Sequence, residues 1–123
     1  MKKSHKNCID FHKQMLESER HKFKCKKEFD LPRNGQLHRL DLACFRERPK
    51  FNSMGFVDSV GLEAETIMKN SPQILSNKKD LETFRKIFPA SKTFHIQTDE
   101  IIDFDKELKP KFPQPFRPGV RFR

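Results

Sequence analysis

The sequence predicts a mainly α-helical fold with extended segments: several short helices joined by Pro/Gly loops, little autonomous core, and an extended C-terminal tail. Three observations lead to this fold class. The 13 Phe residues are scattered singly along the chain instead of gathering on a few periodic faces. The hydrophobic fraction is 34%, which leaves little apolar surface to enclose a private core. The 8 Pro and 4 Gly divide the chain into stretches that suit short helices.

The first helix is predicted over residues 7–29, which contain neither Gly nor Pro. Cys8, Phe11 and Met15 recur at helical spacing and make a thin apolar stripe on an otherwise charged surface. An isolated helix of this kind is marginal in water. We therefore expect it to dock on another surface.

A turn is predicted at residues 30–35, where Asn34-Gly35 is a strong turn signal. A short helix is predicted next, over residues 36–47. Its apolar face consists of Leu37, Leu40 and Cys44. Residues 49–61 contain Pro, two Gly, Asn and two Ser, so they are predicted to form a loop.

Two further helices are predicted in the second half of the chain. A short one over residues 62–70 is closed by Ser71-Pro72. The better specified one covers residues 78–88, with Asn77 as its N-cap. Its apolar face consists of Leu81, Phe84, Ile87 and Phe88.

The end of the chain is predicted to be mostly extended. Residues 93–97 alternate like a brief strand, and a last short helix runs from Thr98 to Leu108. We therefore divide the chain into a short-helix and loop region, residues 1–108, which becomes ordered within an assembly, and a basic tail, residues 109–123. Its prolines favour an extended, polyproline-like geometry.

The charge distribution predicts an acidic partner. Two basic ends flank a mildly acidic middle, and the net charge is +9. A nucleic acid, a tubulin-like protein or an anionic membrane would be electrostatically complementary to the basic ends. No stretch approaches the length of a membrane span, so a membrane partner is not expected. Three cysteines, an odd number, favour a reducing compartment.

A metal site is considered first among the candidate sites, because five possible ligands cluster near the N-terminus. They are His5, Cys8, His12, His21 and Cys25. The Cys8/His12 and His21/Cys25 pairs would have to meet, yet the eight residues between them contain no Gly, Pro or other turn residue. The sequence therefore predicts no metal site.

Catalysis is also not expected. The sequence contains no Gly-rich phosphate loop, no HExxH and no GxSxG. The acidic residues between Asp99 and Glu107 lack the glycine-centred spacing of a calcium loop and are interpreted as a solvated face. The prediction is a protein that is not an enzyme and has no cofactor and no small-molecule substrate.

In its layout the chain resembles the small microtubule inner proteins of cilia and sperm flagella, which are short basic helix-and-loop chains with Pro/aromatic/Arg tails. The stretches that carry the resemblance are FPQPFRPGVRFR and KFNSMGF. It implies a non-catalytic structural protein of the cytoplasm and cytoskeleton, docked on tubulin or other axonemal proteins. The predicted partner-binding residues are Phe112, Phe116, Arg117, Arg121, Phe122 and Arg123.

An RNA partner is the alternative. HKFKCKK, residues 21–27, interleaves Phe23 with lysines, and VRFR closes the chain with Phe122 between two arginines. Cationic side chains that neutralise phosphates, together with aromatic side chains that stack on bases, are typical of RNA-binding proteins. This pattern is typical of a small basic ribosomal or ribosome-associated protein, although no RNP, KH or finger pattern accompanies it.

Overall fold

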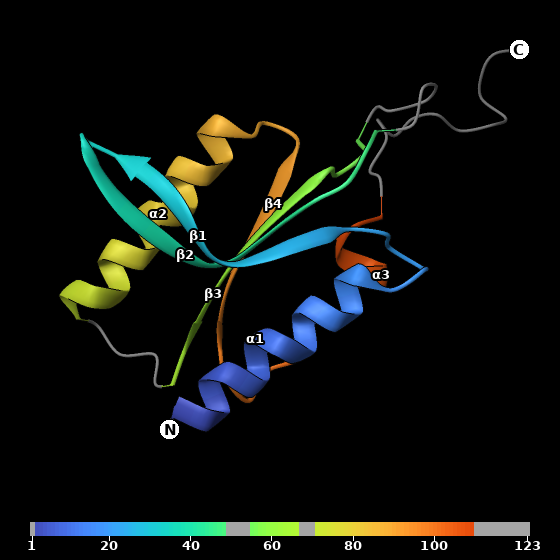
Figure 1. The fold of residues 1–123 in the computed structure, drawn as a ribbon, viewed down its shortest axis with the longest axis horizontal. Coiled ribbons are helices and arrows are strands. Elements are labelled where there is room, and N and C mark those ends of the chain that lie inside the picture. The colour runs from blue at the N-terminus through green and yellow to red at the C-terminus, as the bar shows by residue number, and fades with distance from the viewer. Residues whose placement is uncertain (1, 49–54, 67–70, 110–123) are drawn as a thin grey trace, which may run out of the picture.

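The protein folds around one mixed β-sheet. The computed structural model describes residues 2–48, 55–66 and 71–109. In chain order the elements are α1 (Lys2–Glu17), β1 (Lys24–Arg33), β2 (Gln36–Phe45), β3 (Ser59–Glu65), α2 (Pro72–Ile87), β4 (Ser91–Gln97) and α3 (Phe104–Glu107). The strands lie in the order β1-β2-β3-β4, as Figure 1 shows. The predicted mainly α-helical fold class is therefore wrong.

The β1–β2 hairpin replaces the helix predicted over residues 36–47 and the last part of the first predicted helix. The predicted turn at Asn34-Gly35 is confirmed: both residues have positive φ, 51° and 77°, as a two-residue hairpin turn requires. The predicted helix over residues 36–47 is wrong, because these residues form β2 and pair with β1 in antiparallel register. The predicted first helix ends early, at Glu17.

A disulfide joins Cys25 to Cys44, which face each other across the hairpin. The sequence interpretation treated both cysteines as thiols, and for this pair it is wrong. Cys8 is a free, buried thiol.

β3 is an interior strand of the sheet. It pairs antiparallel with β2 up to Leu62 and parallel with β4 along its whole length. The helix predicted over residues 62–70 is wrong for residues 62–65, which belong to this strand. Residues 67–70 lie outside the described residues. Because a parallel pair needs a long crossover, the chain passes through α2 before β4.

The helix predicted over residues 78–88 is confirmed, although it begins earlier. Ser71 is the N-cap, its side chain accepts a hydrogen bond from the Ile74 backbone N–H, and Pro72 occupies the first turn. Asn77 lies inside the helix and is not its cap. The strand predicted at residues 93–97 is also confirmed, as part of β4.

The sheet is covered on both faces, so the chain has a core of its own and the expected lack of one is wrong. On the α1 face, Cys8, Ile9 and Leu16 pack with apolar residues of all four strands and with α3. On the α2 face, Leu81 and Phe84 pack against the β1–β2 hairpin. Figure 1 shows the two long helices on opposite sides of the sheet.

The predicted tail residues, Phe112 to Arg123, lie outside the described residues. The predicted last helix is shorter than expected and covers Phe104–Glu107, with Asp103 as its N-cap. Within the described ranges, no helix combines the length and apolarity that a bilayer span requires.

Candidate functional site

The sheet divides where β2 and β3 separate. The ladder between them begins at Phe45 and Ser59 and ends at Leu42 and Leu62. Beyond this point β2 continues to pair with β1 and β3 continues to pair with β4, so the two strands diverge, as Figure 1 shows. We call this region the fork. Backbone groups of β3 that face the fork need hydrogen-bond partners other than β2.

Asp41 supplies such a partner. Its Oδ2 accepts a hydrogen bond from the Ala64 N–H at 2.9 Å. The backbone explains the position of this side chain, because Glu28 across the hairpin has φ 52° and interrupts the β1–β2 ladder there. As a result Leu40 packs on the α2 face, Leu42 packs on the α1 face, and Asp41 lies between them at the fork.

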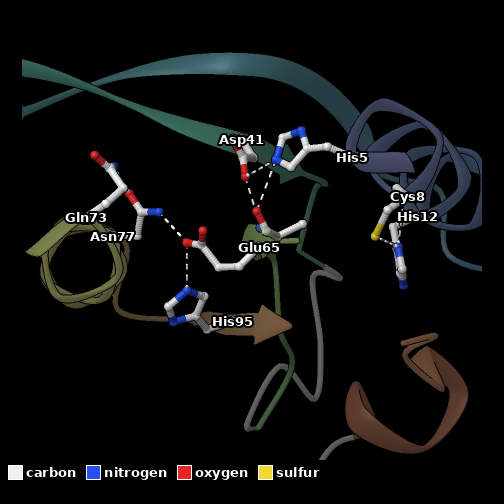
Figure 2. Close-up of polar contacts among 9 residues, drawn as sticks. His5, Cys8, His12, Asp41, Glu65, Gln73, Asn77 and His95 are labelled. Carbon is white, nitrogen blue, oxygen red and sulfur yellow. Dashed lines mark hydrogen bonds and ion pairs between the residues drawn. The ribbon is translucent and has the colours of Figure 1, made fainter. Parts of the chain in front are cut away.

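His5 reaches the fork from α1. Its Nε2 lies 3.1 Å from Asp41 Oδ2 and 3.0 Å from the Ala64 carbonyl oxygen. Because both of those atoms are acceptors, Nε2 carries a proton and donates to both. Figure 2 shows the imidazole pointing from the helix towards Asp41.

Glu63 is the most unusual carboxyl group in the protein. Side chains alternate along β3, so Glu63 lies on the α2 face of the sheet while Leu62 and Ala64 pack on the α1 face. Glu63 is only 2% exposed, and its Oε2 has no hydrogen-bond partner among the described residues. Burial raises the pKa of Glu63 to about 10, with the Asp41 charge and a hydrogen bond to Asp41 as the next causes.

Glu65 is two residues further along the same face. Its Oε2 accepts hydrogen bonds from Asn77 Nδ2 on α2 and from His95 Nε2 on β4, the latter at 3.0 Å. Figure 2 shows these two side chains converging on it from different elements. Their donors fix the orientation of the carboxylate.

A fourth carboxylate, Asp80, lies behind this group on α2. It is 2% exposed, and its Oδ1 lies 2.8 Å from Arg33 Nε, although the two atoms are out of line for a hydrogen bond. The Asp80 charge contributes further to the raised pKa of Glu63. The first half of α2 therefore meets the sheet through polar groups, whereas its second half packs there through Leu81 and Phe84.

The fork has the chemistry of a cation site. Two carboxyl groups lie together, and one of them is buried with an oxygen that no described residue hydrogen-bonds, so either a proton or a cation must offset their repulsion. No three His, Cys, Asp or Glu side chains of the described residues are grouped closely enough to hold a metal ion by themselves. Mg²⁺ does not need three, since it binds through one or two carboxylates, with water and substrate phosphate completing its octahedron.

The metal ligands considered from the sequence are not brought together in one site. His12 Nδ1 donates to the Cys8 carbonyl at 2.8 Å and its Nε2 accepts from the Ile102 N–H at 3.1 Å, so both ring nitrogens are occupied. Burial lowers the pKa of His12. His21 lies beside Asp105, and Cys25 is in the disulfide.

Sequence reasoning missed Asp41, Glu63 and Glu65. The signal was present in two stretches, LDLAC and VGLEAE, where acidic residues alternate with apolar ones. Such alternation indicates a strand with polar side chains at fixed positions. These three acids were instead placed in the helices predicted over residues 36–47 and 62–70, and no role was assigned to them.

A basic hollow lies at the opposite end of β3. It has a volume of about 790 Å³, and its lining includes Arg20, Lys22, Lys24 and Arg46. The Arg46 guanidinium lies between the rings of Phe23 and Phe56, at 4.4 and 4.2 Å from their centroids. Phe23 is 2% exposed, so it supports Arg46 and does not stack on bases as the RNA alternative required.

Comparison of the chain with protein-family models, curated proteins and solved structures finds no match.

Proposed function

We propose that this protein is a divalent-cation-dependent phosphodiesterase that hydrolyses the backbone of a nucleic acid. The observation that carries the proposal is Glu63, a buried carboxyl group next to Asp41 with one oxygen left unpaired among the described residues. A cation bound between the two groups would satisfy that oxygen and remove their repulsion. The neighbouring Ala64 carbonyl offers a third oxygen ligand.

The charge of the whole chain supports a polyanionic substrate. The net charge is +9, and the basic hollow gathers four cationic side chains on one surface. Such surfaces bind nucleic acids by neutralising phosphates. A cation held by carboxylates can in turn bind a phosphate oxygen, which brings substrate and site together.

In this proposal each residue of the site has its own role in hydrolysis. A divalent cation at this position would polarise the phosphoryl group and lower the pKa of a bound water. Asp41 and Glu63 would hold the cation. Glu65, oriented by Asn77 and His95, accepts the proton of the attacking water. The water oxygen bonds to phosphorus as the bond to the leaving sugar oxygen breaks, and that oxygen takes up a proton from solvent.

The test is cleavage of end-labelled single- and double-stranded DNA and RNA by the purified full chain, with Mg²⁺ or Mn²⁺ and with EDTA. Cleavage should require the metal. Asp41→Asn and Glu63→Gln should each lower the rate by about 100-fold or more, because a bound cation contributes several kcal/mol to the transition state.

Asp99→Asn is the matched control, since Asp99 is an exposed acid outside the fork and the substitution changes the net charge equally. It should cleave like the unmodified protein. Cleavage that persists in EDTA, or that is equal in all three variants, would come from a contaminant and would refute the proposal. Absence of cleavage of every substrate would refute it too.

The prediction of a non-catalytic axonemal protein stays a prediction. The residues predicted to bind a partner, from Phe112 to Arg123, lie outside the described residues. One of its premises, the lack of an autonomous core, is wrong. The fork carboxylates favour a catalytic role instead.

A further inference from the structure

Arg46 in the basic hollow is a cation without a counter-ion among the described residues. Its Nε donates to the Val57 carbonyl oxygen at 2.9 Å, and its Nη1 donates to the His21 carbonyl oxygen at 3.0 Å. The described contacts give Nη2 no partner. Asp58 is close enough for its charge to act on Arg46, but its carboxylate is paired with Arg48 at 3.0 Å. The N–H groups of Nη2 therefore remain available to an anion.

The guanidinium of Arg46 is fixed in position before any ligand arrives. Two backbone carbonyls hold it, and it lies between the rings of Phe23 and Phe56 at 4.4 and 4.2 Å from their centroids. Burial lowers the pKa of Arg46, which means that its charge is partly withdrawn from water. A phosphate oxygen suits such a group, because the planar guanidinium binds phosphates through adjacent N–H donors.

Two lysines extend the positive charge around Arg46. Lys22 and Lys24 line the hollow, both are exposed, and neither forms an ion pair with a described carboxylate. Arg20 also lines it but is paired with Asp105 at 2.7 Å. Glu47 is the one acid in the described lining, so cations outnumber it. This surface suits a chain of several phosphates better than a single anion.

The hollow also presents aromatic surface. Phe45 and Phe56 line it, and both are half-buried, so part of each side chain remains accessible. Aromatic rings beside cations are typical of surfaces that bind single-stranded nucleic acids, where bases stack on the rings. In a duplex the faces of the bases are already stacked on one another, and the rings would gain no such contact.

We propose that the basic hollow binds a single strand of nucleic acid, with one phosphate on Arg46 and a base stacked against Phe56. Lys22 and Lys24 neutralise the adjoining phosphates. The proposal rests on the proposed function for the class of partner and deepens it by naming the single-stranded form. Because the hollow and the fork lie at opposite ends of β3, binding at the hollow can be measured separately from cleavage at the fork.

The test is fluorescence anisotropy of a labelled oligothymidylate of about 12 nucleotides, titrated with the full chain in EDTA. An abasic strand and a duplex of the same length are measured in parallel. The oligothymidylate should bind at least about tenfold more tightly than the duplex, although the duplex carries more charge. It should bind about 5–100-fold more tightly than the abasic strand, as expected from the stacking of one base.

Lysine variants test the phosphate contacts. Lys24→Gln should lower the slope of log affinity against log salt concentration by about 0.7, the value for one phosphate contact in a single strand. Lys22→Gly should do the same with little risk to the fold, since Lys22 has φ 59°, a left-handed conformation that favours glycine. Lys79→Gln is the matched control: Lys79 is an exposed lysine outside the described lining of the hollow, and this variant should keep affinity and slope.

Phe56→Leu tests the stacking contact. It keeps an apolar side chain beside Arg46 but removes the aromatic face, so the ratio of oligothymidylate to abasic affinity should fall towards one. Phe11→Leu is the matched control, because Phe11 is 44% exposed and lies outside the described lining of the hollow. Circular dichroism of each variant checks that it is folded.

The inference is overturned if the duplex or the abasic strand binds as tightly as the oligothymidylate. It is also overturned if folded Lys24→Gln and Phe56→Leu proteins bind like the unmodified protein. Poly-glutamate that competes as well as the oligothymidylate would show that the hollow recognises acidic proteins instead.

Failure of this inference and failure of the proposed function are distinguishable. If the hollow variants lose binding as expected but no protein cleaves any substrate, the inference stands and the proposed function fails. If cleavage requires Asp41 and Glu63 while the hollow variants bind and cleave normally, the proposed function stands and only the inference fails.

Discussion

At the scale of single residues, Glu63 gives the folded state a distinctive dependence on pH. Its pKa is raised from 4.5 to about 10, mainly by burial and then by the neighbouring Asp41 charge. Between these two values the folded protein keeps a proton that the unfolded chain has released. Folding is therefore favoured fully below the lower value and progressively less as pH rises towards the upper one.

In the metal-free protein, the free energy of unfolding should accordingly fall between about pH 5 and about pH 9, with a slope approaching about 1.4 kcal/mol per pH unit from this group. Glu63→Gln is neutral at every pH and should remove that part of the slope. Urea denaturation of both proteins in EDTA across this range measures the effect.

A saturating divalent cation at the proposed site should also flatten the slope, because it would take the place of the proton on Glu63. Asp99→Asn serves again as the exposed control and should keep the slope of the unmodified protein. Equal slopes for Glu63→Gln and the unmodified protein would show that Glu63 titrates normally.

At the scale of elements, β3 and α2 approach closely at Gly61. A Cβ built there would lie 2.9 Å from Phe84 Cδ2 and 3.2 Å from Leu40 Cδ2, which is closer than ordinary packing allows. Glycine leaves space at this position for the close approach of the Phe84 ring to the strand.

Gly61→Ala should therefore destabilise the fold by about 1–3 kcal/mol through overpacking. Chemical denaturation gives the value directly. If the Phe84 ring is the cause, the same substitution should cost less in a Phe84→Leu background, with a coupling of about 0.5–3 kcal/mol. Strictly additive costs would locate the strain elsewhere.

The element scale also shows which parts of the fold could be predicted from the sequence. Asn34-Gly35, the apolar face around Phe84 and the strand in residues 93–97 have local signals, and they are confirmed. β2 was not predicted because two apolar patterns overlap in this stretch. Leu40, Leu42 and Cys44 alternate as in a strand, but Leu37, Leu40 and Cys44 also recur at helical spacing. Short apolar stretches carry both periods.

The candidate site could not be predicted in the same way, because it is assembled by pairing between distant segments. Asp41 and Glu63 become neighbours only when β2 and β3 pair and then diverge. His5 joins them from α1, and its signal in the sequence was that of a metal ligand beside Cys8 and His12, not beside Asp41. The sequence grouped His5 with Cys8 and His12, whereas in the structure its ring contacts Asp41.

At the scale of the whole molecule, apolar clusters on both faces of one sheet predict an independently folding unit. Leu16 and Leu62 are completely buried on the α1 face, and Leu40 and Phe84 are completely buried on the α2 face. The two clusters share the strands between them, so neither is expected to melt without the other.

The isolated full chain should therefore unfold in a single cooperative transition. Thermal melting followed by circular dichroism at a helix-sensitive and a strand-sensitive wavelength should give coincident curves. A broad, non-cooperative loss of signal, or two separated transitions, would instead support the sequence-based expectation that the chain is ordered only within an assembly.

The fork has a last consequence, which concerns how this chain would change under laboratory evolution. Asp41 stands where β2 and β3 could otherwise continue their ladder, and Glu63 stands where an apolar side chain would fill the space under α2. Replacing buried ionisable groups with well-packed apolar ones is often stabilising. A library of variants selected for heat resistance alone should thus accumulate apolar residues at these two positions. The most thermostable variants would then lack the carboxyl groups that the proposed activity requires.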